Sequence, residues 1–287
     1  MNGLRCSAES TKIGEPLAGT APEAVRTWLL LEVNDPWAPK AIQTDALPAD
    51  VRTRIEAWLD AHPGSRLQLI RRPQRPARAQ ALMIVDSERN RVARAAIDGY
   101  DALRTVDLDA LAAGASAAES PLYLVCVHGR RDRCCAEHGS AVFRAMARRD
   151  VEVWQTSHLG GHRFAACAVW LPGGWMYGRL RKDDVEALVT AHRAGELGSL
   201  SRFRGRALYD RPTQAAETFL RERLGDNRVD AFRWRSTEPE GESIWRVGFV
   251  RAGAPHAIKV ARQLLDAPRP ASCGAEPEPA TRFVEVA

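Results

Sequence analysis

Apolar and polar positions follow the same order twice along the chain. Each half contains a short apolar strand, an amphipathic helix, three further strands and a closing helix, which is the order βαβββα. In the first half the expected elements are strand 28–33, helix 49–59, strands 67–70, 81–85 and 91–97, and a helix near Leu108. In the second half they are strand 122–127, helix 136–148, strands 151–155, 165–171 and 175–180, and helix 184–193. This order is typical of a thioredoxin-like fold, so we predict an α/β chain (α+β layers) built from two tandem thioredoxin-like units.

The pattern also fits two ordinary α/β layers whose similarity is coincidental, because the offset between the halves shrinks along the chain. A stretch rich in Gly, Ala and Ser at 112–120 suits a linker between the halves. We therefore expect three parts: a degenerate thioredoxin-like half at 1–118, a second thioredoxin-like domain at 119–205, and a C-terminal unit at 206–287.

The C-terminal unit has its own pattern of helix and strands. A helix is expected at 213–224, ended by Gly225, and Trp245, Val247 and Phe249 alternate as in a strand. Residues 232–235 are expected to pair with that strand, and 283–286 to form one more. The Pro- and Ala-rich stretch 268–280 is expected to be loosely ordered. The prediction is a small β-rich unit.

Composition sets broad limits on the class of protein. The chain has 287 residues, of which 45% are hydrophobic and 27% charged, so it can bury a large core without disulfides. It has neither an apolar run that would span a bilayer nor an apolar N-terminal signal, so we expect a cytoplasmic protein. The net charge of +5 permits an acidic partner, but no dense basic face interleaved with aromatic residues indicates nucleic acid. In the cytoplasm its six cysteines are expected to be ligands, reactive thiols or core residues.

Two clusters in the second half carry the candidate chemistry. Cysteines 126, 134 and 135 with His128 span the end of one expected strand and the start of the next helix, and His158 and His162 flank Gly160-Gly161 in a later loop. Loops at the carboxyl ends of neighbouring parallel strands meet, so these thiols and imidazoles should converge. Such a set suits zinc or iron–sulfur chemistry and not calcium or magnesium. The two glycines fit a close approach to something bulky, or simply a tight turn.

The roles of several neighbouring residues can be interpreted in two ways. Cys135 opens the helix, whose dipole favours a thiolate, and Arg130, Arg131, Arg133 and Arg163 add positive charge that would stabilise a reduced centre or guide an acidic redox partner. Asp132 either caps the helix, which we favour, or holds a ligand imidazole, and His128 either supports a ligand or is structural. Cys167 is interpreted as a buried core residue. The remaining residues, interpreted as incidental or without a role, are Cys6, Cys273, His62, His138, His192 and His256.

At these residues the chain resembles the sucrase/ferredoxin-like family, whose members carry a domain similar to the thioredoxin-like 2Fe–2S ferredoxins. The family pattern is Cys-x-His, an Arg-Asp pair, a Cys nine residues after the first, and His-x-Gly-Gly-His followed by Phe-Ala. The matching residues are Cys126-Val127-His128, Arg131-Asp132, Cys135 and His158-Leu159-Gly160-Gly161-His162 followed by Phe164-Ala165. The resemblance reaches from Cys6-Ser7 and 15–21 to about residue 205.

The resemblance implies a 2Fe–2S cluster held by Cys126, Cys135, His158 and His162, with Cys134 as an alternative to Cys135. His128, Arg131, Asp132 and Arg163 would surround these ligands. The first half would then be a degenerate copy, with Glu32 where Cys126 aligns and Pro73 where His158 aligns.

We therefore expect an electron-transfer protein, a carrier rather than a catalyst, with an acidic redox partner. Three rivals stay open: a structural zinc module on the same four residues, a thiol–disulfide enzyme, and a redox sensor with a labile cluster. The word sucrase carries no weight, because no motif marks the two carboxylates that a glycosidase needs.

Overall fold

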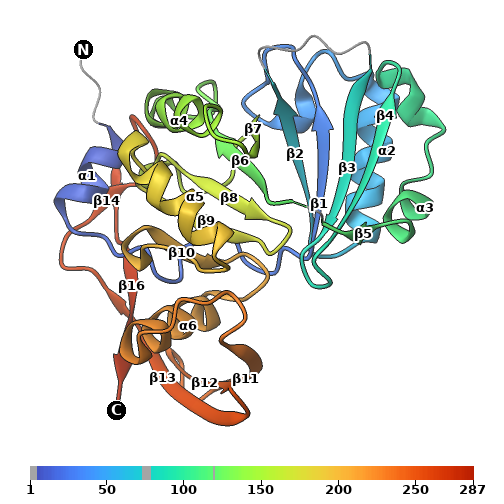
Figure 1. Cartoon of the computed structure of the whole chain (residues 1–287). Coiled ribbons are helices and arrows are strands. Elements are labelled where there is room, and N and C mark those ends of the chain that lie inside the picture. Colours follow the sequence, from blue (N-terminus) through green and yellow to red (C-terminus); the bar gives the residue numbers. More distant parts are fainter. Residues whose placement is uncertain (1–4, 73–78, 119) are drawn as a thin grey trace.

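The repeated βαβββα order is confirmed in the computed structural model, which describes residues 5–72, 79–118 and 120–287. In each unit a helix connects two parallel strands, and an antiparallel hairpin and a second helix follow (Figure 1). The first unit consists of β1 (Thr27–Glu32), α2 (Ala49–Ala61), β2 (Ser65–Arg71), β3 (Gln80–Asp86), β4 (Arg91–Ile97) and α3 (Leu108–Ala113). The second consists of β6 (Leu122–Cys126), α4 (Arg133–Met146), β7 (Glu152–Thr156), β8 (Ala168–Leu171), β9 (Trp175–Tyr177) and α5 (Val185–Arg193).

All of these strands belong to one ten-stranded mixed sheet, in the order β10-β9-β8-β6-β7-β2-β1-β3-β4-β5. Within each unit the spatial order of strands is second, first, third, fourth, and this is a thioredoxin-like fold. The units join where β2 pairs antiparallel with β7, at Ile70 opposite Thr156 and Arg71 opposite Gln155. The second strands of the two units are therefore neighbours, as if the units were related by a twofold axis through the sheet.

The central strands of the sheet are buried on both faces, which explains the unbroken apolar run of β1. Leu29 and Leu31 face one hydrophobic cluster, which takes in apolar residues of α2, α3, α4 and α5, so these helices cover one side. Trp28 and Leu30 face a second cluster, which is closed by Leu17 and neighbouring residues of the N-terminal segment. A strand covered on both sides has no solvent face, so its sequence does not alternate.

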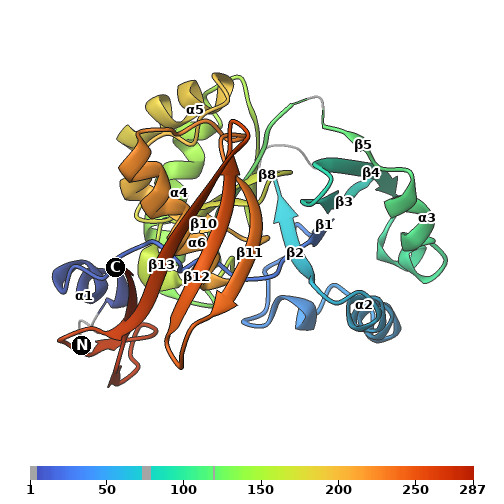
Figure 2. The same ribbon diagram turned by 90° about the horizontal axis from the view of Figure 1, so that it is seen from below.

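The C-terminal unit packs α6 (Arg211–Leu224) against a four-stranded antiparallel sheet, which crosses the helix in Figure 2. The predicted helix, its end at Gly225, the two paired strands and the last strand are all confirmed. The longest strand, β13, was not predicted. The strands in sheet order are β11 (Arg233–Pro239), β12 (Ile244–Arg251), β13 (Ala254–Leu264) and β16 (Thr281–Val286).

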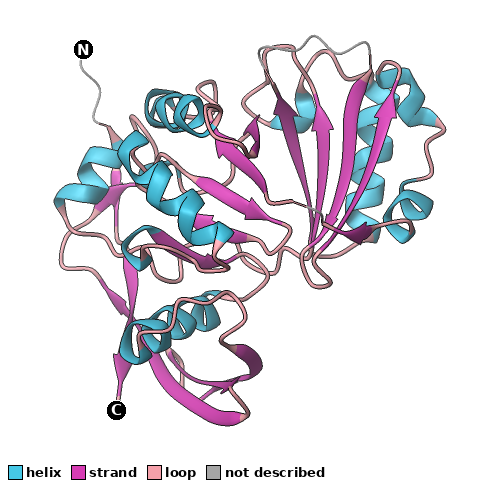
Figure 3. Cartoon of the chain, viewed as in Figure 1, coloured by secondary structure: helices cyan, strands magenta, loops and turns pink. Residues whose placement is uncertain are grey.

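Three segments differ from their expected character (Figure 3). The 268–280 stretch, expected to be loose, contains the paired short strands β14 (Arg269–Pro270) and β15 (Pro277–Glu278), which lie beside the unpredicted helix α1 (Cys6–Lys12). The expected linker holds the end of α3 and the strand β5 (Ser116–Ala117). A further unpredicted strand, β10 (Phe203–Arg206), extends the large sheet beyond β9.

Two expectations concern the first unit and the membrane. Glu32 ends β1 as Cys126 ends β6, and its buried carboxylate accepts a hydrogen bond from the backbone of Ala81, whereas Pro73 lies outside the described residues. Of the helices in the described ranges, none combines the length and the apolar character needed to cross a bilayer.

Candidate metal centre

Two thiols and one imidazole converge where the second unit's parallel strands end. Cys126 is the last residue of β6, Cys135 lies in the first turn of α4, and His158 follows β7. One ligand atom of each lies within 4.8 Å of the others, and Cys135 Sγ is 3.7 Å from His158 Nδ1. Because β6 and β7 are parallel neighbours, their following loops meet, as predicted.

His162 stands next to this group but is not part of it. Its ring centroid is 5.0 Å from that of His158, and its Nε2 lies 3.8 Å from a carboxylate oxygen of Asp132. Both of its ring nitrogens are buried and have no hydrogen-bond partner among the described residues. Burial lowers the pKa of His162, which favours the neutral ring with a free lone pair. A buried imidazole in this state is suited to bind a metal.

The two sulfur atoms of the centre interact with one another. The hydrogen bond from Cys135, helped by His158, holds the pKa of Cys126 well below its usual value despite burial. The same contact raises the pKa of Cys135. One proton therefore serves both sulfurs, and a metal could replace it.

Asp132 and His128 hold the backbone around the centre. Asp132 caps α4, as favoured from the sequence, since its carboxylate accepts a hydrogen bond of 2.9 Å from Cys134 N. This cap begins the helix at Arg133, three residues before the predicted start. His128 Nδ1 accepts a hydrogen bond of 3.2 Å from the backbone of His158, so it positions that residue.

The structure separates the two adjacent cysteines whose roles were ambiguous. Consecutive residues on a helix point in different directions, and Cys134 Sγ lies 3.3 Å from Cys273 Sγ and 3.7 Å from Cys6 Sγ, away from the Cys126 group. Cys6 and Cys273 were interpreted as incidental, but the structure places both of them beside Cys134. The Cys6-Ser7 pair was noted as part of the resemblance, whereas nothing in the sequence marked Cys273. All six cysteines are free, and none of them forms a disulfide.

The arginines around the centre divide into two kinds. Arg130, Arg131 and Arg133 are exposed on the loop and first turn that lead into α4. Arg163 instead forms an ion pair of 2.9 Å with the buried Glu15 and lies over the ring of Phe164. The exposed arginines alone therefore give the centre a positive surface.

The glycines of the loop have a specific neighbour. Gly160 and Gly161 both have positive φ, of 95° and 72°, and a Cβ on Gly161 would lie 2.5 Å from the guanidinium of Arg204. Arg204 donates to the carbonyl of Gly160 over 2.9 Å. The bulky group that Gly161 admits is thus an arginine on β10, and the positive φ of both residues also favours glycine.

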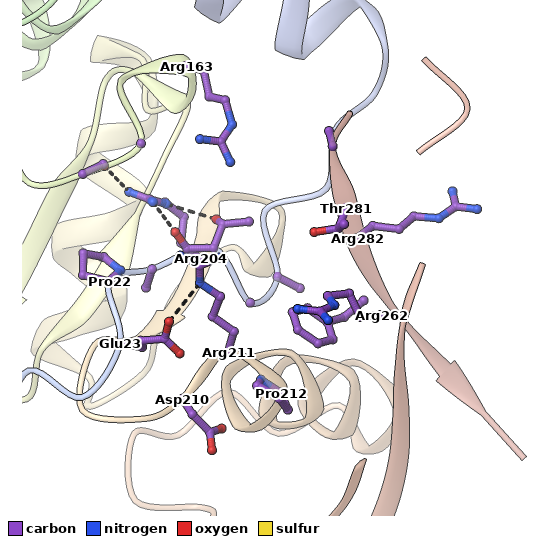
Figure 4. Close-up of a pocket in the computed structure, with 18 of the residues that line it drawn as sticks. Pro22, Glu23, Arg163, Arg204, Asp210, Arg211, Pro212, Arg262, Thr281 and Arg282 are labelled. Carbon is purple, nitrogen blue, oxygen red and sulfur yellow. Dashed lines mark hydrogen bonds and ion pairs between the residues drawn. The ribbon is translucent and has the colours of Figure 1, made fainter. Parts of the chain in front are cut away.

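Behind this loop lies a cavity of about 640 Å³ lined by many arginines (Figure 4). It is enclosed by the N-terminal segment, the loop of Gly160 and Gly161, the start of α6 and the strands β13 and β16. The arginines that line it are Arg66, Arg163, Arg204, Arg211, Arg262, Arg269 and Arg282, and the acidic residues are Glu23 and Asp210.

The sequence model of the sucrase/ferredoxin-like family matches residues 17–205, and the chain belongs to this family. Among solved structures, it is similar to a thioredoxin-like [2Fe-2S] ferredoxin from Aquifex aeolicus, with 22% identity and a TM-score of 0.24, over 27% of this chain and 84% of that one. A cysteine-to-serine variant of that ferredoxin matches with 19% identity and a TM-score of 0.26, over 29% and 96%. No curated protein matches the chain significantly.

Proposed function

We propose that the chain is a one-electron carrier whose 2Fe–2S cluster is held by Cys126, Cys135, His158 and His162. The observation that carries the proposal is the convergence of two thiols and an imidazole beside a second imidazole whose ring nitrogens are buried and lack a hydrogen-bond partner among the described residues. When bound, such a cluster takes up and releases single electrons. Family membership supports the same assignment.

The chain's own residues would give the two sides of the centre different surroundings. Cys126 and Cys135 are each only 2% exposed, whereas His158 and His162 are partly exposed. Electrons would therefore enter and leave on the histidine side, where the covering protein is thinner. We propose that the exposed Arg130, Arg131 and Arg133 attract an acidic partner to this side, since opposite charges speed encounter.

The first prediction concerns metal content. Protein purified without air should contain about two irons and two sulfides per chain and absorb visible light. Cys135→Ser should lose the iron, because serine cannot replace the thiolate at this site, whereas Cys167→Ser should keep it. Cys167 is the matched control because it is as buried as Cys135, at 3% exposed, and lies outside the Cys126 group. A colourless protein that holds only zinc would overturn the electron-transfer proposal and leave a structural zinc module.

Protein purified in the same way also tests whether His162 is a ligand. His162→Cys should keep the iron but lower the midpoint potential, because a thiolate adds negative charge where an imidazole was neutral. Potentials of about −150 to +300 mV are typical of two-histidine centres, against about −400 mV for four-cysteine plant-type ones. An unchanged potential in His162→Cys would show that His162 is not a ligand.

A further inference from the structure

A second group of ligand atoms lies beside the first and uses none of its residues. Cys6, Cys134, Cys273 and Asp132 each place one ligand atom within 4.8 Å of the other three. The first residue of α1, the cap and first turn of α4, and the loop between β14 and β15 thus meet at one point. More than a hundred residues separate Cys134 from each of the other two cysteines.

The distances within this group match a tetrahedral metal site. The three sulfur–sulfur distances are 3.3, 3.7 and 3.8 Å, and Asp132 Oδ1 is 3.7 Å from Cys6 Sγ and 3.2 Å from Cys273 Sγ. Zinc bonds of about 2.3 Å to sulfur and about 2.0 Å to oxygen place tetrahedral ligands about 3.8 Å apart for two sulfurs and about 3.5 Å apart for sulfur and oxygen. Disulfide bonding does not explain the group, because three sulfurs cannot all pair and a disulfide needs about 2.0 Å.

The surroundings hold the ligands in place and favour their charged forms. Asp132 accepts hydrogen bonds from the backbones of Cys134 and Cys273, at 2.9 and 2.8 Å, and these stabilise its carboxylate. Ser7 Oγ donates to Cys134 Sγ over 3.2 Å and contacts His138.

We propose that Cys6, Cys134, Cys273 and Asp132 bind one zinc ion in a site that is separate from the proposed cluster. Four protein ligands leave no open position, so the site is structural and not catalytic. Zinc would fasten the segments that carry Cys6 and Cys273 to the first turn of α4. In that turn Cys134 is followed directly by Cys135 of the candidate metal centre. Cys6 and Cys134 are fully buried and Cys273 is partly exposed, so the ion would enter from the Cys273 side.

The experiment measures zinc by elemental analysis in the full-length chain and follows its thermal unfolding. Wild type should hold one zinc per chain, and Cys6→Ser and Cys273→Ser should each lose it and unfold at a lower temperature. Cys167→Ser is the matched control and should keep it. In Cys135→Ser, which removes a residue of the proposed cluster, zinc should stay, so failure of the cluster proposal does not imitate failure of this one.

Three results would overturn the zinc proposal. The first is wild-type protein without zinc after growth in zinc-sufficient medium, and the second is zinc that survives in both Cys6→Ser and Cys273→Ser. The third is loss of iron with retention of zinc in Cys134→Ser, which would make Cys134 a residue of the first centre. Cobalt(II) added to zinc-free protein should also give the intense visible absorption of tetrahedral thiolate ligation, and its absence would count against the site.

A different observation, the charge of the cavity in Figure 4, carries a second inference independently. Among the described residues, Arg66, Arg204 and Arg262 line this cavity without a carboxylate at ion-pair distance, and Arg204 is only 1% exposed. Burial and the neighbouring Arg204 lower the pKa of Arg66 to about 10, so the two cations repel one another. A buried cation without a counter-ion is costly, and a bound anion would relieve that cost.

We infer that this cavity binds a small ligand with several negative charges, such as an organic phosphate. Arg66 also donates to the carbonyl of His158 over 3.0 Å and Arg204 to that of Gly160 over 2.9 Å. The ligand would therefore contact residues that hold the loop bearing both histidines of the candidate metal centre.

Calorimetry with inorganic pyrophosphate tests this inference on the full chain. Arg262→Gln should weaken binding about tenfold, which is about 1.4 kcal/mol, because it removes a charged hydrogen-bond donor from the cavity. Arg235→Gln removes the same charge at an exposed position outside the cavity and should bind as wild type does. Absence of binding at millimolar pyrophosphate, or equal affinity of the two variants, would refute the inference.

Discussion

Gly139→Ala should destabilise the fold by about 3 kcal/mol and empty the candidate metal centre. Gly139 lies in α4 where the helix crosses the end of β6, and an added Cβ would fall far inside contact distance of the Cys126 carbonyl oxygen, with Val127 also close. The obstacle is backbone, so relief requires the helix to move away from the strand. Overpacking of this kind costs about 1–3 kcal/mol, and a clash with backbone belongs at the upper end. The same movement separates Cys135 on the helix from Cys126 on the strand.

Urea denaturation and metal analysis measure the two effects of Gly139→Ala together. Gly241→Ala is the matched control, because Gly241 has no neighbour within 4 Å and lacks a positive φ. It should change neither stability nor metal content appreciably. Wild-type stability in Gly139→Ala would show that α4 is not held against β6 as described.

Glu15→Gln should be comparably damaging, at about 3–5 kcal/mol, because it removes the negative charge from a buried ion-pair network. The Glu15 carboxylate is 1% exposed and accepts hydrogen bonds from Ser10 at 2.7 Å, Arg163 at 2.9 Å and Arg269 at 3.1 Å. These partners come from α1, from the turn that begins at His162, and from β14. Glutamine would leave the buried Arg269 and the partly buried Arg163 without their shared carboxylate, and Arg269 would keep only its ion pair with Glu278.

The measurement for Glu15→Gln is again stability together with bound zinc. Because α1 carries Cys6 and the loop after β14 carries Cys273, loosening of both segments should weaken zinc retention. Glu276→Gln, an exposed change in the same C-terminal segment, should leave both readouts unchanged. If Glu15→Gln unfolds at the wild-type urea concentration, the carboxylate does not hold these segments together.

Local patterns predicted most of the fold, and the failures have physical causes. Strands such as β1 and β6 carry long apolar runs because they are buried on both faces, so their positions could be read from the sequence. The strand β13 was missed because only its middle is buried and its ends, from Ala254 and near Leu264, are exposed. The β2–β7 pairing covers only two residue pairs and is supported by polar side-chain contacts such as that of Arg71 with Gln155, so no periodic apolar pattern marks it. The division of the chain at 118/119 and 205/206 stays a prediction.

The residues of the candidate metal centre could be predicted because they lie in motifs, whereas those of the second group could not. Cys126, Cys135, His158 and His162 stand in two short motifs, so a topology that brings two loops together was enough to group them. Cys6 and Cys273 are single cysteines near opposite ends of the chain, and no spacing rule connects them to Cys134. Only the packing of α1 and the β14–β15 hairpin onto α4 brings these three sulfurs together.

The pairing of β2 with β7 also bears on how the chain could have diverged. Two separate thioredoxin-like subunits joined in this way would associate only above some concentration, whereas two units on one polypeptide stay together at any dilution. Covalent linkage further removes the requirement that both copies be identical. A buried Glu32 at the end of β1, where the second unit has Cys126, is therefore compatible with support of the second unit by β2. Both units thus share one order of strands, whereas Cys126, Cys135, His158 and His162 all lie in the second unit.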